Sequence, residues 1–511
     1  MRVLATSSVR IFSPMLALVV LGILGALANP WGPQNALVQE TLGQEPLVQA
    51  TLGQATLVQA TLGQEPDPTE KLSLWTRTKG KDWPRMLGVH YDSKNTETGI
   101  LTQWPKDGLR IVWHEKLGTG YGNGVAALGR WLQFDRHGNV ERLSCYEAQT
   151  GKFLWKWEAS VVYQDAYGYN DGPRSSPIVD GRYVYVYGVA GRIACVDIET
   201  GKELWQRNLS SDYSVVPNFF GVGASPLVYN DLLIAMVGGS PKRGFFSRSA
   251  TINDMPSAKP DGTGMIALDK RTGKEVYRVG NYLASYSAPI IAKLHGEDYC
   301  VSLMREGLLI FRAKDGTGEQ FFPFRATTLE SVNAASPVVH DNKIFISEAY
   351  EIGSAMLEFT GSELKLLWRD EGMRSSQSMR THWTTPLLHE NRLYASSGRN
   401  PTDTDIRCIE LQGNQPPRTV WSQRNRDRGT GMIVDSHWLW LGENGKLHLL
   451  KLGSDTHEVV AEMDLQLKPQ PGSKEPILTP PSWAPPVLSH GLLFVRGSDR
   501  IICLELIPES N

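Results

Sequence analysis

The sequence lacks several of the motifs that would identify a metal site or a type of enzyme. Its five cysteines include no adjacent pair, and its eleven histidines show no His-x-x-His spacing, so the usual pattern of a zinc site is missing. Neither a Gly-x-Ser-x-Gly elbow nor a phosphate-binding loop occurs. The formal net charge is −2 and basic residues form no tract. Nothing in the charge therefore favours nucleic acid or an anionic membrane surface as a partner.

Long apolar runs are also scarce, and the clearest one is N-terminal. Arg2 and Arg10 precede the run at residues 11–28, which ends in Ala26-Leu27-Ala28. This pattern predicts a signal peptide over residues 1–28, or an uncleaved N-terminal membrane anchor. Both alternatives predict export to a periplasmic or other extracytoplasmic location, the second with residues 11–28 in the inner membrane. No cysteine follows the run before Cys145, which argues against a lipid anchor.

Residues 29–82 read as a low-complexity linker. A five-residue repeat such as Ala50-Thr51-Leu52-Gly53-Gln54 runs between Asn35 and Gln64. It is similar to the pentapeptide repeats that build a β-helix, but six copies give little more than one coil, and Thr or Pro stands where Asp or Asn is favoured. We expect a spacer.

From residue 83 onward the sequence repeats a β-rich unit at intervals of about fifty residues, with one stretched copy. Each unit holds four short alternating strands, which are too few to bury their own faces, so the units must stack around a ring or along a line. The clearest copy runs from Ser175 to Trp205. The units begin at Val125, Pro177, Pro226, Pro289, Pro337, Pro386, Met432 and Pro486.

The two ends of the repeat region favour the ring. The last unit, from Ala484 to Leu506, supplies three strands and lacks the fourth, whereas an orphan strand of the fourth type, with Trp113 at its aromatic position, precedes the first unit. Pairing the two leaves no exposed edge. We therefore predict an all-β fold, an eight-bladed β-propeller over residues 83–511 that is closed by its N-terminal strand. A solenoid is the alternative.

Several units end in Thr-Gly-Lys followed by an aromatic residue, as at Cys145 to Trp155, Cys195 to Trp205 and Ala267 to Tyr277. The glycine accepts a positive φ in the turn, and the aromatic ring is large enough to fill an interface between blades. These segments resemble the repeat of PQQ-like β-propellers. That resemblance implies one of two classes: quinoprotein dehydrogenases, which oxidise alcohols or sugars with pyrroloquinoline quinone (PQQ) and calcium, or non-catalytic BamB-like scaffolds of the outer-membrane assembly machine.

The residues of the sequence do not supply the chemistry of a quinoprotein dehydrogenase. Four of the cysteines, all but Cys300, occupy one repeat position in separate blades and should not meet. Glu147, Asp197 and Asp269 stand at the repeated turn, where a structural hydrogen bond explains them. Asp403-Thr404-Asp405 is a tight acidic pair without further calcium ligands. We assign no catalytic residue, no metal ligand and no cofactor; PQQ with calcium belongs to the alternative function.

One face of the propeller is predicted to bind a ligand or a partner. Segments that lead into the inner strands are rich in aromatic and arginine side chains, which recognition surfaces favour. The candidate residues are Tyr167, Tyr169, Arg174, Phe219, Phe220, Tyr286, Asn333, Arg374, Arg380, His382, Trp383 and Trp483. The competing interpretation is that half of them only plug the channel mouth. The stretched third unit adds a long loop, predicted to be a lid over this face, with Lys242, Arg243, Phe245, Phe246 and Arg248.

The sequence thus predicts an exported PQQ-like β-propeller that acts as a binding or scaffold module in the cell envelope, with a protein or carbohydrate partner. Contact with a membrane is expected only through the N-terminal anchor. The alternative is a PQQ-dependent quinoprotein dehydrogenase, and a structural envelope or adhesion module also stays open.

Overall fold

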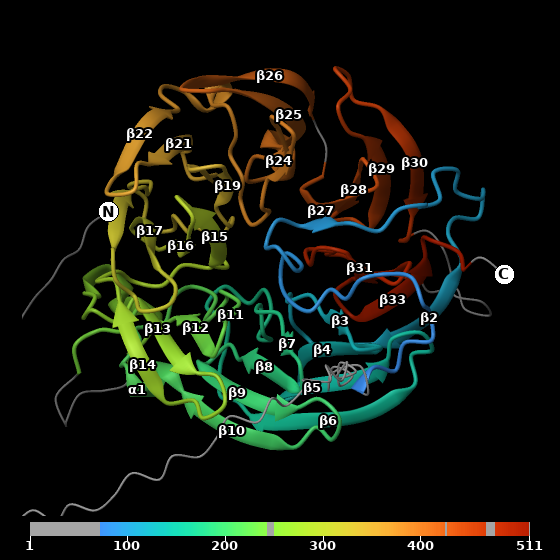
Figure 1. Cartoon of the computed structure of the whole chain (residues 1–511), viewed down its shortest axis with the longest axis horizontal. Coiled ribbons are helices and arrows are strands. Elements are labelled where there is room, and N and C mark those ends of the chain that lie inside the picture. Colours follow the sequence, from blue (N-terminus) through green and yellow to red (C-terminus); the bar gives the residue numbers. More distant parts are fainter. Residues whose placement is uncertain (1–71, 243–249, 425–426, 467–475, 510–511) are drawn as a thin grey trace, which may run out of the picture. The chain divides into compact units, whose positions relative to one another are not determined.

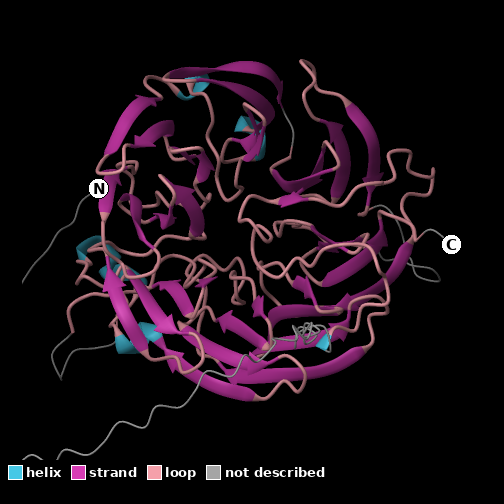
Figure 2. Cartoon of the chain, in the orientation of Figure 1, coloured by secondary structure: helices cyan, strands magenta, loops and turns pink. Residues whose placement is uncertain are grey.

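The computed structural model describes residues 72–242, 250–424, 427–466 and 476–509, which all belong to one compact unit. They form eight sheets arranged as blades around a central axis (Figure 1). Helical structure is confined to short turns (Figure 2): α1 (Leu209–Asp212) and the 3-10 turns η2 (Ile252–Ser257), η3 (Arg374–Ser376) and η4 (Pro401–Asp403). The prediction of an all-β, eight-bladed propeller is confirmed.

The predicted N-terminal segment at residues 1–28 and most of the predicted linker lie outside the described residues. Within the described part of the chain, no helix is long and apolar enough to cross a membrane.

Within each blade consecutive strands pair antiparallel, and the sheet of blade seven has β1 (Lys94–Asn95) as a fifth strand, paired in parallel with the first strand of that blade. The strands of blades one to four are β3 (Val125–Ala127), β4 (Arg130–His137), β5 (Val140–Glu147) and β6 (Phe153–Ser160); β7 (Ile178–Asp180), β8 (Tyr183–Tyr187), β9 (Arg192–Asp197) and β10 (Glu203–Asn208); β11 (Leu227–Tyr229), β12 (Leu232–Met236), β13 (Met265–Asp269) and β14 (Glu275–Val279); β15 (Ile290–Leu294), β16 (Glu297–Leu303), β17 (Gly307–Arg312) and β18 (Gln320–Pro323).

Blades five to eight continue in the same order. Their strands are β19 (Val338–His340), β20 (Lys343–Glu348), β21 (Gly353–Phe359) and β22 (Leu364–Arg369); β23 (Leu387–His389), β24 (Arg392–Ser397), β25 (Asp405–Gln412) and β26 (Gln415–Arg424); β27 (Gly429–Val434), β28 (His437–Gly442), β29 (Lys446–Lys451) and β30 (Val459–Asp464); β31 (Val487–Ser489), β32 (Leu492–Arg496) and β33 (Arg500–Glu505) with β2 (Ile111–Lys116).

The repeated turn and aromatic residue join neighbouring blades. Gly201 adopts φ +69°, and a Cβ there would lie 2.6 Å from the ring of Trp155 in the preceding blade. The indole of Trp155 donates a hydrogen bond to the Ile198 carbonyl at 2.9 Å. The Asp197 carboxylate accepts hydrogen bonds from the backbone and hydroxyl of Thr200. The motif therefore serves the interface between blades.

The ring closes where β2 pairs antiparallel with β33, with Trp113 opposite Cys503. Trp113 repeats the arrangement at the blade interfaces: its indole donates to the Ala148 carbonyl at 2.8 Å, and a Cβ on Gly151 would lie 2.8 Å from its ring. This is the pairing that the sequence predicts. The first and last blades are thus held together by main-chain hydrogen bonds and a shared apolar core.

The segment at residues 83–95 crosses one end of the central channel (Figure 1). Trp83 exchanges backbone hydrogen bonds with Ala126 of β3, and the Pro84 carbonyl accepts one from Val179 of β7. The Tyr91 hydroxyl donates to the Val228 carbonyl of β11, and the short strand β1 (Lys94–Asn95) pairs in parallel with β27. Because this segment touches inner strands around the ring, it forms a floor to the channel.

Candidate functional site

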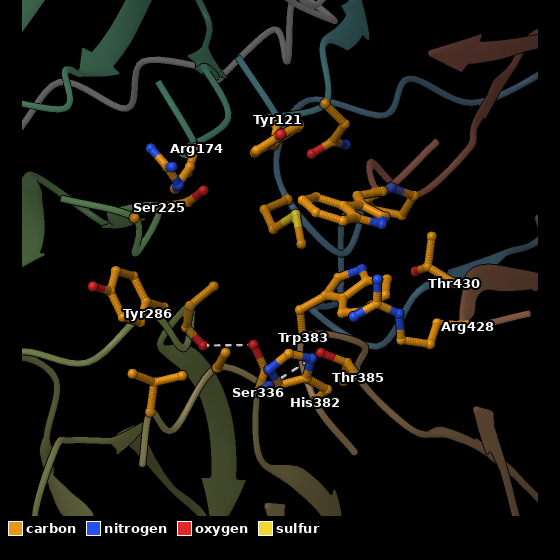
Figure 3. A pocket seen from close by; sticks show the side chains of 18 of the residues that line it. Tyr121, Arg174, Ser225, Tyr286, Ser336, His382, Trp383, Thr385, Arg428 and Thr430 are labelled. Atoms are coloured by element: carbon orange, nitrogen blue, oxygen red, sulfur yellow. Dashed lines mark hydrogen bonds between the residues drawn. The ribbon is translucent and has the colours of Figure 1, made fainter. Parts of the chain in front are cut away.

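A cavity of about 300 Å³ lies inside the ring, with Met86, Leu87 and Ser93 of the floor segment in its lining. Residues that come shortly before the inner strand of every blade form its walls (Figure 3). In blade order, one such residue from each is Tyr121, Arg174, Phe220, Tyr286, Val332, Trp383, Arg428 and Trp483. The cavity is therefore a product of the whole ring, and no single blade contains it.

Aromatic rings form part of the wall, and neighbouring rings contact one another. The ring centroids of Trp383 and Trp483 are 5.4 Å apart, and Trp483 lies 4.6 Å from Tyr121. On the other side, Phe220 lies 5.6 Å from Tyr286. Such rings offer flat apolar surfaces with polar edges, which suit a planar ligand.

Three arginines line the cavity, and two of them are neutralised. Arg174 pairs with buried Asp165 at 2.5 Å. Arg428 makes a bidentate ion pair with Glu443 and lies over the ring of Trp383, with 4.5 Å between guanidinium and centroid. These carboxylates face the arginines from behind, and the lining itself contains no Asp or Glu among the described residues.

Arg399 differs from the other two. Its guanidinium stacks over the ring of Tyr350 at 4.4 Å, and within the described chain it has neither an ion pair nor a side-chain hydrogen bond. The Arg399 carbonyl accepts a hydrogen bond from the Arg428 guanidinium at 3.0 Å, which fixes the backbone at this point. A half-buried positive charge thus faces the cavity without a counter-ion in the described structure.

The polar groups beside Arg399 are held in neutral forms. Burial, with smaller contributions from Arg428 and Arg399, lowers the pKa of His382 to about 3. The Tyr350 hydroxyl lies 3.1 Å from His382 Nε2, and burial raises the pKa of Tyr350. With Tyr350 as the donor, the proton of the neutral imidazole is on Nδ1. Both His382 Nδ1 and Trp383 Nε1 are buried without a hydrogen-bond partner among the described residues.

The structure brings many of the predicted binding residues to this cavity. Those in its lining are Tyr169, Arg174, Phe220, Tyr286, His382, Trp383 and Trp483. Tyr167 lies next to them, 5.8 Å from both Phe219 and Phe220. Phe219 and Asn333 are buried behind the wall, where the Asn333 amide donates to the carbonyls of Met304 and Phe324.

Two predicted arginines point elsewhere. Arg380 is buried and forms a bidentate ion pair with Asp403, at 2.7 and 3.0 Å. Arg374 lies at the same outer groove, between Glu351 and Asp403. Asp405 is in turn paired with Arg407. The acidic pair noted in the sequence therefore serves as a partner for arginines.

Of the predicted lid, Lys242 is described and exposed, whereas Arg243, Phe245, Phe246 and Arg248 lie outside the described residues. The described part of this loop packs near the channel face: Ile252 contacts the apolar cluster of Phe219, Val332 and Tyr350. Whether the loop covers the cavity stays a prediction.

Several residues of the cavity are not among those predicted from the sequence. Tyr121 and Arg428 precede inner strands in the same way as the predicted residues do, so their position was a usable signal. Tyr350 and Arg399 follow the second strands of blades five and six, on connections that also reach this face.

The family model described as outer membrane protein assembly factor BamB matches residues 105–241 and 157–381, together more than half of the chain. The chain belongs to this family. A search of curated proteins finds no matching sequence.

Two solved structures are similar to this BamB-family chain. BamB from Moraxella catarrhalis superimposes with a TM-score of 0.51 at 12% identity, over 79% of this chain and 99% of the other. Quinohemoprotein alcohol dehydrogenase from Comamonas testosteroni gives a TM-score of 0.46 at 12% identity, over 84% of this chain and 81% of the other. At 12% identity, the likeness to BamB from Moraxella catarrhalis shows the fold alone.

Proposed function

We propose that this BamB-family propeller is an exported, non-catalytic binding module of the cell envelope, and that its partner engages the face on which the central cavity opens. The observation that carries the proposal is the convergence of aromatic and arginine side chains from around the ring on one cavity. Exposed aromatic side chains beside the cavity extend this surface: Tyr169 is 62% exposed and Tyr167 is 53% exposed. Apolar surface of this kind is typical of interaction sites.

The quinoprotein alternative requires calcium ligands, which can be compared with the oxygen atoms that the cavity lining offers. Calcium takes six to eight oxygen ligands, with carboxylates among them. The cavity lining offers hydroxyls and the amides of Asn123 and Asn400 but no carboxylate among the described residues, and the nearby Asp165 and Glu443 are engaged by arginines. The residues present do not fit calcium beside a quinone, so we derive no oxidation step.

Site-specific photo-crosslinking in cells that produce the full chain tests the proposal. We expect a photoreactive residue at Tyr169 to form a discrete adduct, and the same residue at Phe153 to form none. Phe153 is a matched control because it is 52% exposed but lies on the outer strand β6. Equal adducts at both positions, or none at Tyr169, would contradict the proposal.

A second assay addresses the alternative directly. Purified protein is incubated with pyrroloquinoline quinone and calcium, and then assayed for bound-quinone absorbance and for dye reduction with alcohols and sugars. Saturable binding with turnover would overturn the binding-module proposal.

A further inference from the structure

We infer that the cavity takes a flat apolar group bearing one acidic group, and that Arg399 pairs with the acid. This inference rests on the proposed function, and it names the chemistry that the cavity recognises. The shared chemistry could come from a free aromatic acid or from neighbouring aromatic and acidic side chains of a partner protein.

The charge of Arg399 favours an acidic ligand. Of the three guanidinium groups in the lining, Arg174 and Arg428 already have carboxylate partners, and only Arg399 has none within the described chain. A cation in a partly desolvated site attracts an anion far more strongly than one in water does. One unneutralised arginine indicates one acidic group on the ligand.

The guanidinium of Arg399 is also preorganised for binding. The stacking of Arg399 on Tyr350 and the hydrogen bond from Arg428 to the Arg399 carbonyl restrict the side chain before any ligand arrives. A guanidinium held in this way presents its fork of N–H donors at little further entropic cost, and a carboxylate or sulfonate accepts two parallel bonds from it.

Two buried donors also belong to the cavity that Arg399 lines. His382 Nδ1 and Trp383 Nε1 have no hydrogen-bond partner among the described residues, although a buried polar atom normally has one. Both residues line the cavity with Arg399. Because each of these atoms exposes less than 1 Å² of surface, an anionic oxygen would reach them only after a small rotation of the His382 and Trp383 side chains.

The apolar part of the ligand follows from the remaining walls. Trp383, Trp483, Phe220 and Tyr286 present rings around the same space, and Figure 3 shows Tyr286 and Trp383 on opposite sides of it. A flat apolar body would stack on these rings while its acid reaches Arg399.

Two fluorescent probes that share an aromatic body test the inference on the full-length protein. Anilinonaphthalene sulfonate carries the acid, and phenylnaphthylamine lacks it. We expect saturable binding of the sulfonate, weakened at least about tenfold in Arg399→Gln and less in Arg399→Lys, because charge-assisted hydrogen bonds are lost. Binding of the neutral probe should change less than about twofold.

Arg369→Gln is the matched control, since Arg369 is an exposed arginine at the end of β22, outside the cavity lining. Unchanged sulfonate binding in Arg399→Gln, equal losses for both probes, or an equal loss in Arg369→Gln would overturn the inference. Circular dichroism of each variant is used to check that it is folded.

Displacement of the bound sulfonate distinguishes the two sources. Displacement by naphthoate assigns a free aromatic acid, and displacement by the capped peptide acetyl-Trp-Asp-amide assigns a protein segment; displacement by neither overturns the inference. If sulfonate binding does not depend on Arg399 while the Tyr169 adduct persists, the inference fails alone. Loss of the adduct and of all probe binding means that the proposed function fails as well.

Discussion

The ion pair of Arg428 and Glu443 should hold together the wall that carries Trp383 and Trp483. The two side chains are 16% and 9% exposed and approach to 2.5 Å. Glu443 also accepts a hydrogen bond from the Trp483 indole at 3.0 Å, while Arg428 covers the ring of Trp383. Removing either charge therefore leaves the other buried beside two aromatic rings.

The expected magnitude follows from this burial. At a separation near 3 Å and an effective dielectric constant of about 20, the attraction is roughly 5 kcal/mol, offset by the cost of desolvating both ions. Breaking a buried pair by removing one partner costs about 3–5 kcal/mol. We expect a loss of about 3 kcal/mol in the free energy of unfolding for Arg428→Gln and for Glu443→Gln, and a similar loss, not twice as much, for the double variant.

Urea unfolding of the four proteins, followed by tryptophan fluorescence and circular dichroism, measures this coupling; coincident curves are needed for a two-state treatment. Arg418 and Glu410 form a control pair at 2.8 Å on an outer face, where Arg418 is 55% exposed. Their single variants should cost less than about 1 kcal/mol. If the losses for Arg428→Gln and Glu443→Gln add to within about 0.5 kcal/mol in the double variant, the reasoning is refuted.

Two further predictions concern closure and pH. Trp113→Ala should lower the free energy of unfolding by about 3–5 kcal/mol, which is about 5 °C in Tm for a cooperative body of roughly 400 residues. Trp155→Ala should lower it by a similar amount, because both indoles pack on a turn glycine and donate a hydrogen bond to a carbonyl. A much smaller loss for Trp113→Ala in thermal unfolding would show that the ring does not close cooperatively. Burial raises the pKa of Glu348 from 4.5 to about 7. The protonated side chain therefore contributes up to about 3 kcal/mol to the stability of the fold, and this contribution is complete below about pH 4.5 and is lost as the pH rises through 7. Between about pH 5 and pH 8 the Tm of the parent should therefore fall more steeply than that of Glu348→Gln, and parallel curves would contradict the assignment.

The fold could be predicted from sequence because its determinants are local and repeated. The turn glycine and the aromatic residue after it recur in register, and the structure shows why: Gly201 lies against Trp155, and Gly151 against Trp113. The orphan strand was informative for the same reason, since Trp113 occupies the repeat position that the last blade lacks.

The site could be predicted only in outline, because it depends on the direction in which loop side chains point. Arg174 and Arg380 both precede inner strands, yet one faces the cavity and the other turns to Asp403. No sequence periodicity fixes that choice, which is made by a carboxylate from another loop. Arg399 escaped notice because its importance lies in lacking such a carboxylate in the described structure, and only three-dimensional contacts reveal this.

The order of events during biosynthesis follows from where the first segments find their partners. β1 pairs with β27, and β2 pairs with β33, so β1 and β2 can pair only after strands more than three hundred residues later have been synthesised. Bringing such distant segments together is entropically costly and slow compared with pairing within a blade. A nascent chain therefore keeps β1 and β2 unpaired while the first blades form, and the pairing of β1 at the channel floor and the closure of the ring by β2 come only after the last blades have been made.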